Sequence, residues 1–66
     1  MGKTMQMLKI IKCNDHMRWY ANKIGELVPF LGYSNLEYKS REDAGYVNFV
    51  QHGDAEVVVK ESQDDQ

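Results

Sequence analysis

The sequence predicts a small, mainly β domain. Its 66 residues leave room for one domain, and a chain of this length buries only about 60% of its surface. The best ordered pattern is residues 45–50 followed by 55–59, two short stretches rich in branched and aromatic residues on either side of the polar turn 51–54. Such a pattern predicts two adjacent strands joined by a tight turn.

Local composition predicts the other strands. Residues 7–13 are short, rich in branched apolar side chains and bounded by a polar pair, which indicates the first strand. Residues 23–31 predict a second strand, which Pro29 confines to a sheet edge or a bulge because proline has no backbone N–H to donate. Residues 36–40 alternate apolar and polar positions, as a half-buried strand does.

Residues 14–22 allow two interpretations. Asn14 and Asp15 could cap a helix whose apolar stripe runs through Met17, Tyr20, Ile24 and Leu27. Gly25 lies inside that stripe, and Pro29 would have to end the helix. We therefore expect a long first loop, with one short helix as the alternative.

The two ends of the chain lack an apolar period. We expect residues 1–6 to form a flexible leader and residues 60–66 a disordered acidic tail. The folded domain would then span residues 7–59.

Charge and cysteine content narrow the class of protein. The net charge of −2 comes from the tail, since residues 1–59 hold seven acids and seven bases. That balance argues against both a basic phosphate-binding protein and an acidic DNA mimic. The single Cys13 excludes an internal disulfide, and there is no apolar run of the roughly 20 residues that a membrane span needs. We expect a cytoplasmic protein that makes no contact with a membrane.

The residues that could carry chemistry do not form a site in the sequence. Cys13, Asp15 and His16 cannot complete a tetrahedral metal site, and no downstream pair has ligand spacing. The three serines lie in or beside turns or in the tail, without the strand-to-helix glycine context of a nucleophile. We expect no metal, no cofactor and no enzymatic activity.

The aromatic residues are the remaining signal. Phe30 and Phe49 are expected in the core. Trp19 and Tyr20 are adjacent, so on an extended chain they point to opposite faces and at least one is exposed. Four consecutive residues have the composition of an interface hot spot and are the candidate partner-binding site: Met17, Arg18, Trp19 and Tyr20. In the competing interpretation, Trp19 folds down as a lid on the domain.

Two other kinds of partner stay open. A basic strip beside Trp19 and Tyr20 would suit single-stranded nucleic acid, because small barrels hold it on a stacking platform with nearby cations. The strip consists of Lys9, Lys12, Arg18 and Lys23. Exposed strand edges in so small a sheet would also favour a homodimer.

The order of these elements resembles the SH3-like small barrel, with five short strands, a long first loop and a one-turn break before the last strand. Residues 23–28 are similar to its second strand, and residues 45–50 and 55–58 to its last two. No tryptophan pair precedes Gly45, so the proline-rich ligands of its signalling branch are not implied. Trp19-Tyr20 ahead of residues 24–26 also resembles short uncharacterised proteins encoded by phages of Gram-positive bacteria.

These resemblances imply a five-stranded SH3-like barrel with disordered termini. They also imply a non-enzymatic interaction module, a phage-encoded accessory protein that binds and modulates a host protein in the host cytoplasm. A small-barrel nucleic-acid-binding protein is the alternative.

Overall fold

The structure is a computed structural model that describes residues 3–62. Six strands and one 3-10 turn make up its regular structure. They are β1 (Lys3–Ile10), β2 (Leu27–Pro29), β3 (Gly32–Tyr33), β4 (Glu37–Arg41), β5 (Val47–Gln51), η1 (His52–Asp54) and β6 (Ala55–Ser62). The expected mainly β class is confirmed.

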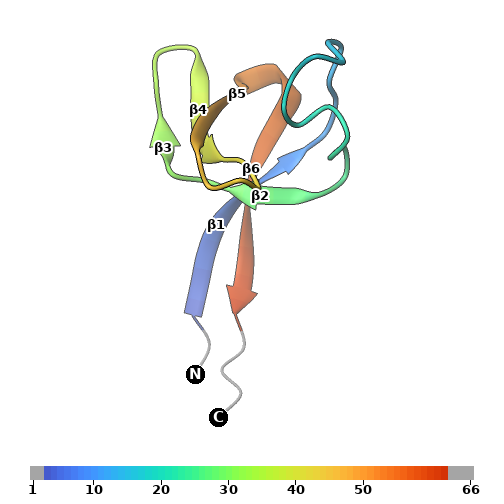
Figure 1. Ribbon diagram of the computed structural model, residues 1–66. Coiled ribbons are helices and arrows are strands. Elements are labelled where there is room, and N and C mark those ends of the chain that lie inside the picture. Colours follow the sequence, from blue (N-terminus) through green and yellow to red (C-terminus); the bar gives the residue numbers. More distant parts are fainter. Residues whose placement is uncertain (1–2, 63–66) are drawn as a thin grey trace.

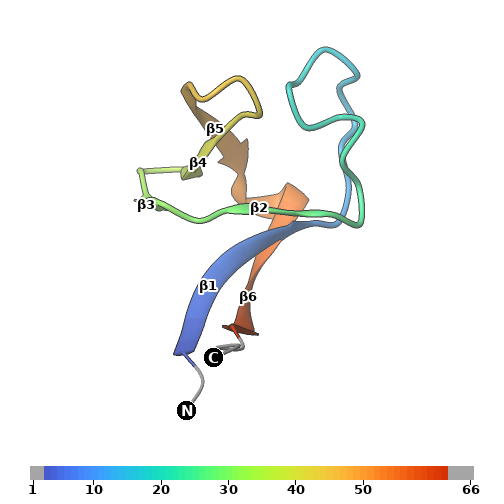
Figure 2. The ribbon, with the colours of Figure 1, turned by 60° about the horizontal axis from the view of Figure 1, so that its bottom comes forward.

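The strands form two antiparallel sheets of three strands each, ordered β2-β1-β6 and β3-β4-β5 (Figure 1, Figure 2). The expected second strand, residues 23–31, is divided: β2 begins only at Leu27 and ends at Pro29, and β3 follows in the other sheet. The strands therefore number six rather than five. Gly32 adopts a φ of 145°, a conformation that glycine reaches readily, where the chain passes into the second sheet.

The inner faces of the two sheets, together with Tyr20 from the connection between β1 and β2, supply the core. Its buried members are Leu8, Ile10, Tyr20, Val28, Val50 and Ala55. Phe30 packs against them, but the expectation that Phe49 is a core residue is wrong, because its side chain is 38% exposed. Successive side chains of a strand point to opposite faces, so burying Val50 turns Phe49 outward.

The two ends of the chain pair with each other. β1 and β6 are in register from Lys3 opposite Ser62 to Ile10 opposite Ala55. Their outer parts form a two-stranded stem, residues 3–6 with 59–62, that projects from the body in both ribbon views. For residues 3–6 and 60–62 the structure differs from the expected leader and tail, because pairing between β1 and β6 places them in strands without an apolar period. Residues 1–2 and 63–66 lie outside the described residues.

The long first loop is confirmed, and the alternative helix is wrong: residues 11–26 connect β1 to β2 through a series of turns. Backbone N–H groups of Arg18, Ala21 and Lys23 each donate to the carbonyl three residues earlier. The Asp15 carboxylate accepts from the backbone N–H of Met17 at 2.9 Å, an Asx turn that competes with helix formation.

A buried hydrogen bond fixes this loop to the rest of the molecule. The Tyr20 hydroxyl, which is fully buried, donates to Asp54 Oδ2 at 2.6 Å and accepts from the backbone N–H of Gln51 at 3.3 Å. The Asp54 carbonyl accepts from the N–H groups of Ile11 and Lys12, at the start of the loop. η1 is therefore bonded to the loop at two places.

Replacing Tyr20 with Phe tests this connection. The variant keeps the ring but leaves the buried Asp54 carboxylate without its donor, so we expect the free energy of unfolding to fall by about 1–3 kcal/mol. Urea unfolding at neutral pH measures it. Tyr46→Phe is the matched control, because Tyr46 is 70% exposed. An equal loss in both variants would contradict the role of the bond.

The same bond predicts a dependence on alkaline pH. Burial, and then the hydrogen bond to Asp54, raises the pKa of Tyr20 from 10.0 to about 12. The folded state thus favours the neutral phenol more than the unfolded state does. Stability from this group is complete below pH 10 and is lost as the pH rises from 10 towards 12. Ultraviolet titration of the wild type against Tyr20→Phe isolates the Tyr20 transition, and a transition near pH 10 would contradict this prediction.

Candidate functional site

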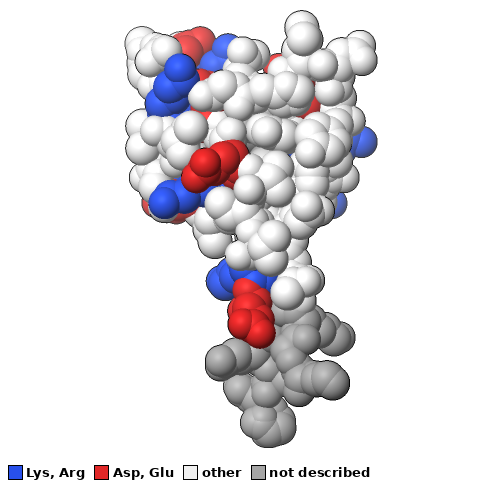
Figure 3. Space-filling view, turned by 180° about the vertical axis from the view of Figure 1, so that it is seen from behind, with Lys and Arg blue, Asp and Glu red and all other residues white. Residues whose placement is uncertain are grey.

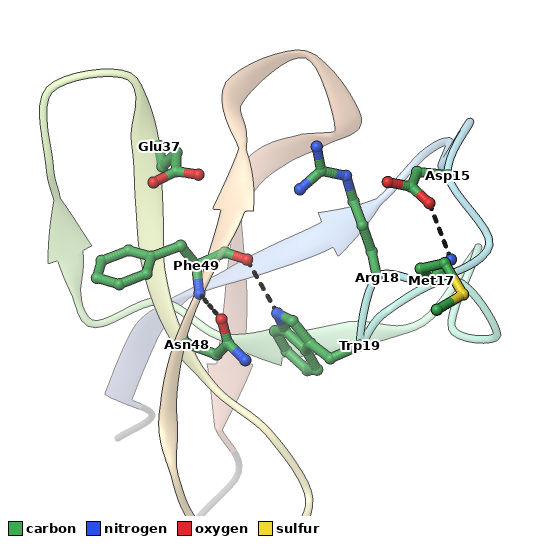
Figure 4. A pocket seen from close by; sticks show the side chains of 7 residues that line it. All are labelled: Asp15, Met17, Arg18, Trp19, Glu37, Asn48 and Phe49. Atoms are coloured by element: carbon green, nitrogen blue, oxygen red, sulfur yellow. Dashed lines mark hydrogen bonds between the residues drawn. The ribbon is translucent and has the colours of Figure 1, made fainter.

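A surface hollow of about 370 Å³ lies between the long loop and the second sheet. We call it the loop–sheet pocket. Its lining residues are Asp15, Met17, Arg18, Trp19, Glu37, Asn48 and Phe49. Figure 4 shows that the loop supplies one side of it, with Arg18 and Trp19, and that β4 and β5 supply the other, with Glu37 and Phe49.

Trp19 holds the two sides of the pocket together. Its indole Nε1–H donates to the Phe49 carbonyl at 2.9 Å. The same ring packs edge-on against Tyr20, with ring centroids 5.6 Å apart. Tyr20 is anchored in the core. The indole of Trp19 is therefore held on one side by packing against the Tyr20 ring and on the other by its hydrogen bond to Phe49. The pocket wall is therefore built before any partner arrives.

The rim of the pocket exposes large apolar groups. The Met17 side chain is 79% exposed, while the Asx turn at Asp15 fixes its backbone. Phe49 is 38% exposed on the opposite side. An unbranched thioether adapts its shape to different surfaces, whereas the ring offers a rigid apolar area. The pocket rim therefore offers an adaptable apolar contact at Met17 and a rigid one at Phe49.

The charges at the pocket are mixed. Asp15 and Glu37 carry carboxylates, and Arg18 carries the one positive charge of the lining. Glu37 also borders a second hollow of about 480 Å³, lined by Ser34, Asn35, Leu36, Glu37 and Gln51. Leu36 is 78% exposed there, and Gln51 Nε2 donates to Glu37 Oε2 at 3.4 Å. An acidic group thus lies between two partly apolar hollows.

The structure separates the four candidate residues. Met17, Arg18 and Trp19 line the pocket, but Tyr20 is fully buried and cannot contact a partner. Tyr20 was expected in the partner-binding site, but the structure places it in the core, where its hydroxyl bonds to Asp54. Trp19 is half-buried: it packs on the core, as the lid interpretation expects, and it also lines the pocket.

Sequence reasoning missed the half of the pocket that the second sheet supplies. Glu37, Asn48 and Phe49 lie far from the loop in sequence. The alternation of residues 46–50 does place Phe49 and Val50 on opposite faces, but it leaves open which face is buried. A cluster of aromatic rings was also missed, formed by Phe30, Tyr33, Tyr38 and His52, whose neighbouring centroids lie 4.5–6.2 Å apart.

The expected basic strip is not a free row of cations. Lys23 Nζ lies 2.7 Å from Asp43 Oδ2, and this hydrogen bond raises the pKa of Lys23. Arg18 lies in the pocket beside acidic residues. Figure 3 shows one face of the molecule, on which basic and acidic side chains are interspersed. With Tyr20 buried, the stacking platform is also reduced to Trp19.

Residues 3–62 contain no group of three or more His, Cys, Asp or Glu side chains that could hold a metal ion. Within the same residues, no helix has the length and apolar character to cross a membrane.

The fold and the pocket together define a small two-sheet β protein with a preformed, partly apolar surface hollow. Comparison of the chain with protein-family models, with curated proteins and with solved structures found no match.

Truncating Trp19 tests how the pocket wall is held. Trp19→Ala removes the half-buried ring and its hydrogen bond, so we expect a loss of about 2 kcal/mol in the free energy of unfolding. A domain of this size has only a few kcal/mol to lose. Thermal unfolding followed by circular dichroism measures the effect. Trp19→Phe, which keeps a ring, should lose less, and an unchanged stability in Trp19→Ala would contradict the structural role of the indole.

Proposed function

We propose that the chain is a non-enzymatic protein-interaction module that binds a partner protein at the loop–sheet pocket. The observation that carries the proposal is the meeting of Met17 and Trp19 from the loop with Phe49 from the sheet around one hollow. Methionine, arginine and aromatic residues are enriched at protein interfaces, and such residues around a central hollow form hot spots.

The polar residues suggest what the partner presents. Asp15 and Glu37 border the apolar part of the pocket, against the single base Arg18. A partner segment with an apolar side chain next to a lysine or arginine would fill the hollow and pair with a carboxylate. Charge pairs at the rim of an interface contribute specificity and association rate more than affinity.

The order of elements supports an SH3-like fold, which we propose as the finer description of the structure. A long loop after the first strand and a 3-10 turn before the last strand support the resemblance seen in the sequence, whereas the division of the second strand departs from it. The pocket lies beside that long loop, as the interaction proposal requires.

Because the sequence resembles short phage proteins, we propose that the partner is a protein of the host cytoplasm. In this proposal the chain is a phage-encoded accessory protein that changes the activity of its host target. Nucleic acid is the alternative partner, and it is distinguished by the sensitivity of binding to nuclease and to salt.

Exposed pocket residues allow the proposal to be tested without unfolding the chain. The tagged full chain is used to capture partners from a Gram-positive bacterial lysate, and the affinity of the captured protein is then measured. We expect Met17→Ala and Phe49→Ala each to weaken binding by about tenfold or more, because they remove apolar contact at the pocket rim. Tyr46→Ala is the control, since Tyr46 is 70% exposed and lies outside the pocket lining.

Two outcomes would overturn this proposal. One is a partner that binds Met17→Ala and Phe49→Ala as tightly as the wild type. The other is capture that disappears with nuclease and weakens steeply with salt, which would indicate phosphate contacts and the nucleic-acid alternative.

A further inference from the structure

The last strand has an unpaired edge. β6 spans Ala55–Ser62 and, among the described residues, pairs only with β1, so no strand is paired with its other edge. Glu56, Val59 and Lys60 are exposed on it, and Val59 is 66% exposed. A row of unpaired N–H and C=O groups is a template for pairing with another strand.

The other edges of the two sheets are less suited to pairing. β2 has three residues and ends at Pro29, and β3 has two residues. Trp19 of the long loop bonds to the Phe49 carbonyl on β5. β6 is therefore the longest edge strand and contains no proline.

The sequence of β6 is complementary to itself. Residues 56–60 are Glu-Val-Val-Val-Lys, with opposite charges at equal distances on either side of Val58. If two copies pair antiparallel with Val58 opposite Val58, then Glu56 of each copy lies opposite Lys60 of the other. Val57 lies opposite Val59 in the same register. Opposite charges and β-branched pairs directly across two strands are both favourable.

We propose that a second copy of this chain binds the free edge of β6, in this two-fold register centred on Val58. The two β2-β1-β6 sheets would then join into one continuous six-stranded sheet. Each Val59 gains a valine of the other copy across the strand pair, and each Lys60 gains a carboxylate. None of the residues that line the loop–sheet pocket belongs to β6, so the inference is independent of the proposed function.

The stem gives a second reason to expect another copy of the chain at the β6 edge. β2 pairs with β1 only from Met7 to Lys9. In the stem, residues 3–6 of β1 therefore pair with residues 59–62 of β6 and with no third strand. A two-stranded ribbon is marginally stable in water, whereas additional strands with an apolar face stabilise it. Pairing through β6 would place a third and fourth strand against the stem.

Charge variants of the full chain test the register by sedimentation velocity over a range of concentrations. Glu56→Lys places lysine opposite Lys60 of the other copy, and Lys60→Glu places glutamate opposite Glu56. We expect either change to weaken self-association by about tenfold, because two attractive pairs become repulsive. An equimolar mixture of the two variants restores both opposite-charge pairs, so we expect it to associate as the wild type does.

The control is Glu61→Lys, an equal charge change on the same strand, whose position faces the uncharged Ala55 in this register. Circular dichroism checks folding, because Glu56 also faces Lys9 within the chain. If Glu56→Lys does not fold, Lys60→Glu still tests the register, since Lys60 faces the uncharged Met5.

A disulfide gives an independent readout of the register. In a Cys13→Ser background, Val58→Cys should form a crosslinked dimer under mild oxidation, because directly opposed strand residues lie within the Cα separation that a disulfide spans. Lys60→Cys should not, since positions 60 and 60 are offset along the strands.

Three results would overturn the proposal: a wild-type chain that stays monomeric at about 1 mM, association that neither charge variant weakens, or a mixture that does not recover.

Discussion

The structure depends on a hydrogen bond between two residues that lie far apart in the chain. The Tyr20 hydroxyl donates to Asp54 inside the core, at 2.6 Å. Residues 11–26 have no ladder of their own, and loops of this length adopt many conformations unless side chains fix them. With Tyr20 bonded to the turn η1, Trp19 is brought to the edge of β5 and the loop–sheet pocket is formed. The buried Tyr20–Asp54 contact, together with the hydrogen bond from Trp19 to Phe49, thus positions the loop side of the candidate site.

Local patterns predicted much of the sheet. The expected strand at 36–40 corresponds to β4, Glu37–Arg41, and the expected strand at 45–50 to β5, Val47–Gln51. Alternation of apolar and polar residues is a property of each strand by itself, so it can be found without knowing the strand's neighbours. The choice of a loop over a helix at residues 14–22 also rested on local signals, Gly25 and Pro29, and it was right.

Features that depend on distant partners could not be predicted. The ends of the chain look polar and aperiodic, yet residues 3–6 and 59–62 pair because β1 and β6 run side by side. Adjacency indicated that Trp19 and Tyr20 face different ways, but only the position of Asp54 decides that Tyr20 is the buried one. Phe49 faces outward for the same kind of reason, since the core lies on the Val50 side of β5.

The two proposed surfaces lie in different parts of the molecule, and their separation has a physical consequence. The long loop lies at the end of the body that is remote from the stem in Figure 1 and Figure 2. None of the residues that line the loop–sheet pocket belongs to β6, so a dimer joined through β6 would not use the residues of either pocket. Two linked pockets bind a partner that is itself repeated or oligomeric more tightly than either pocket does alone, because the second contact is intramolecular. The advantage disappears for a partner with a single binding segment, for which each pocket acts independently. A small domain with one modest pocket can in this way bind tightly to an assembly while binding its separate subunits weakly.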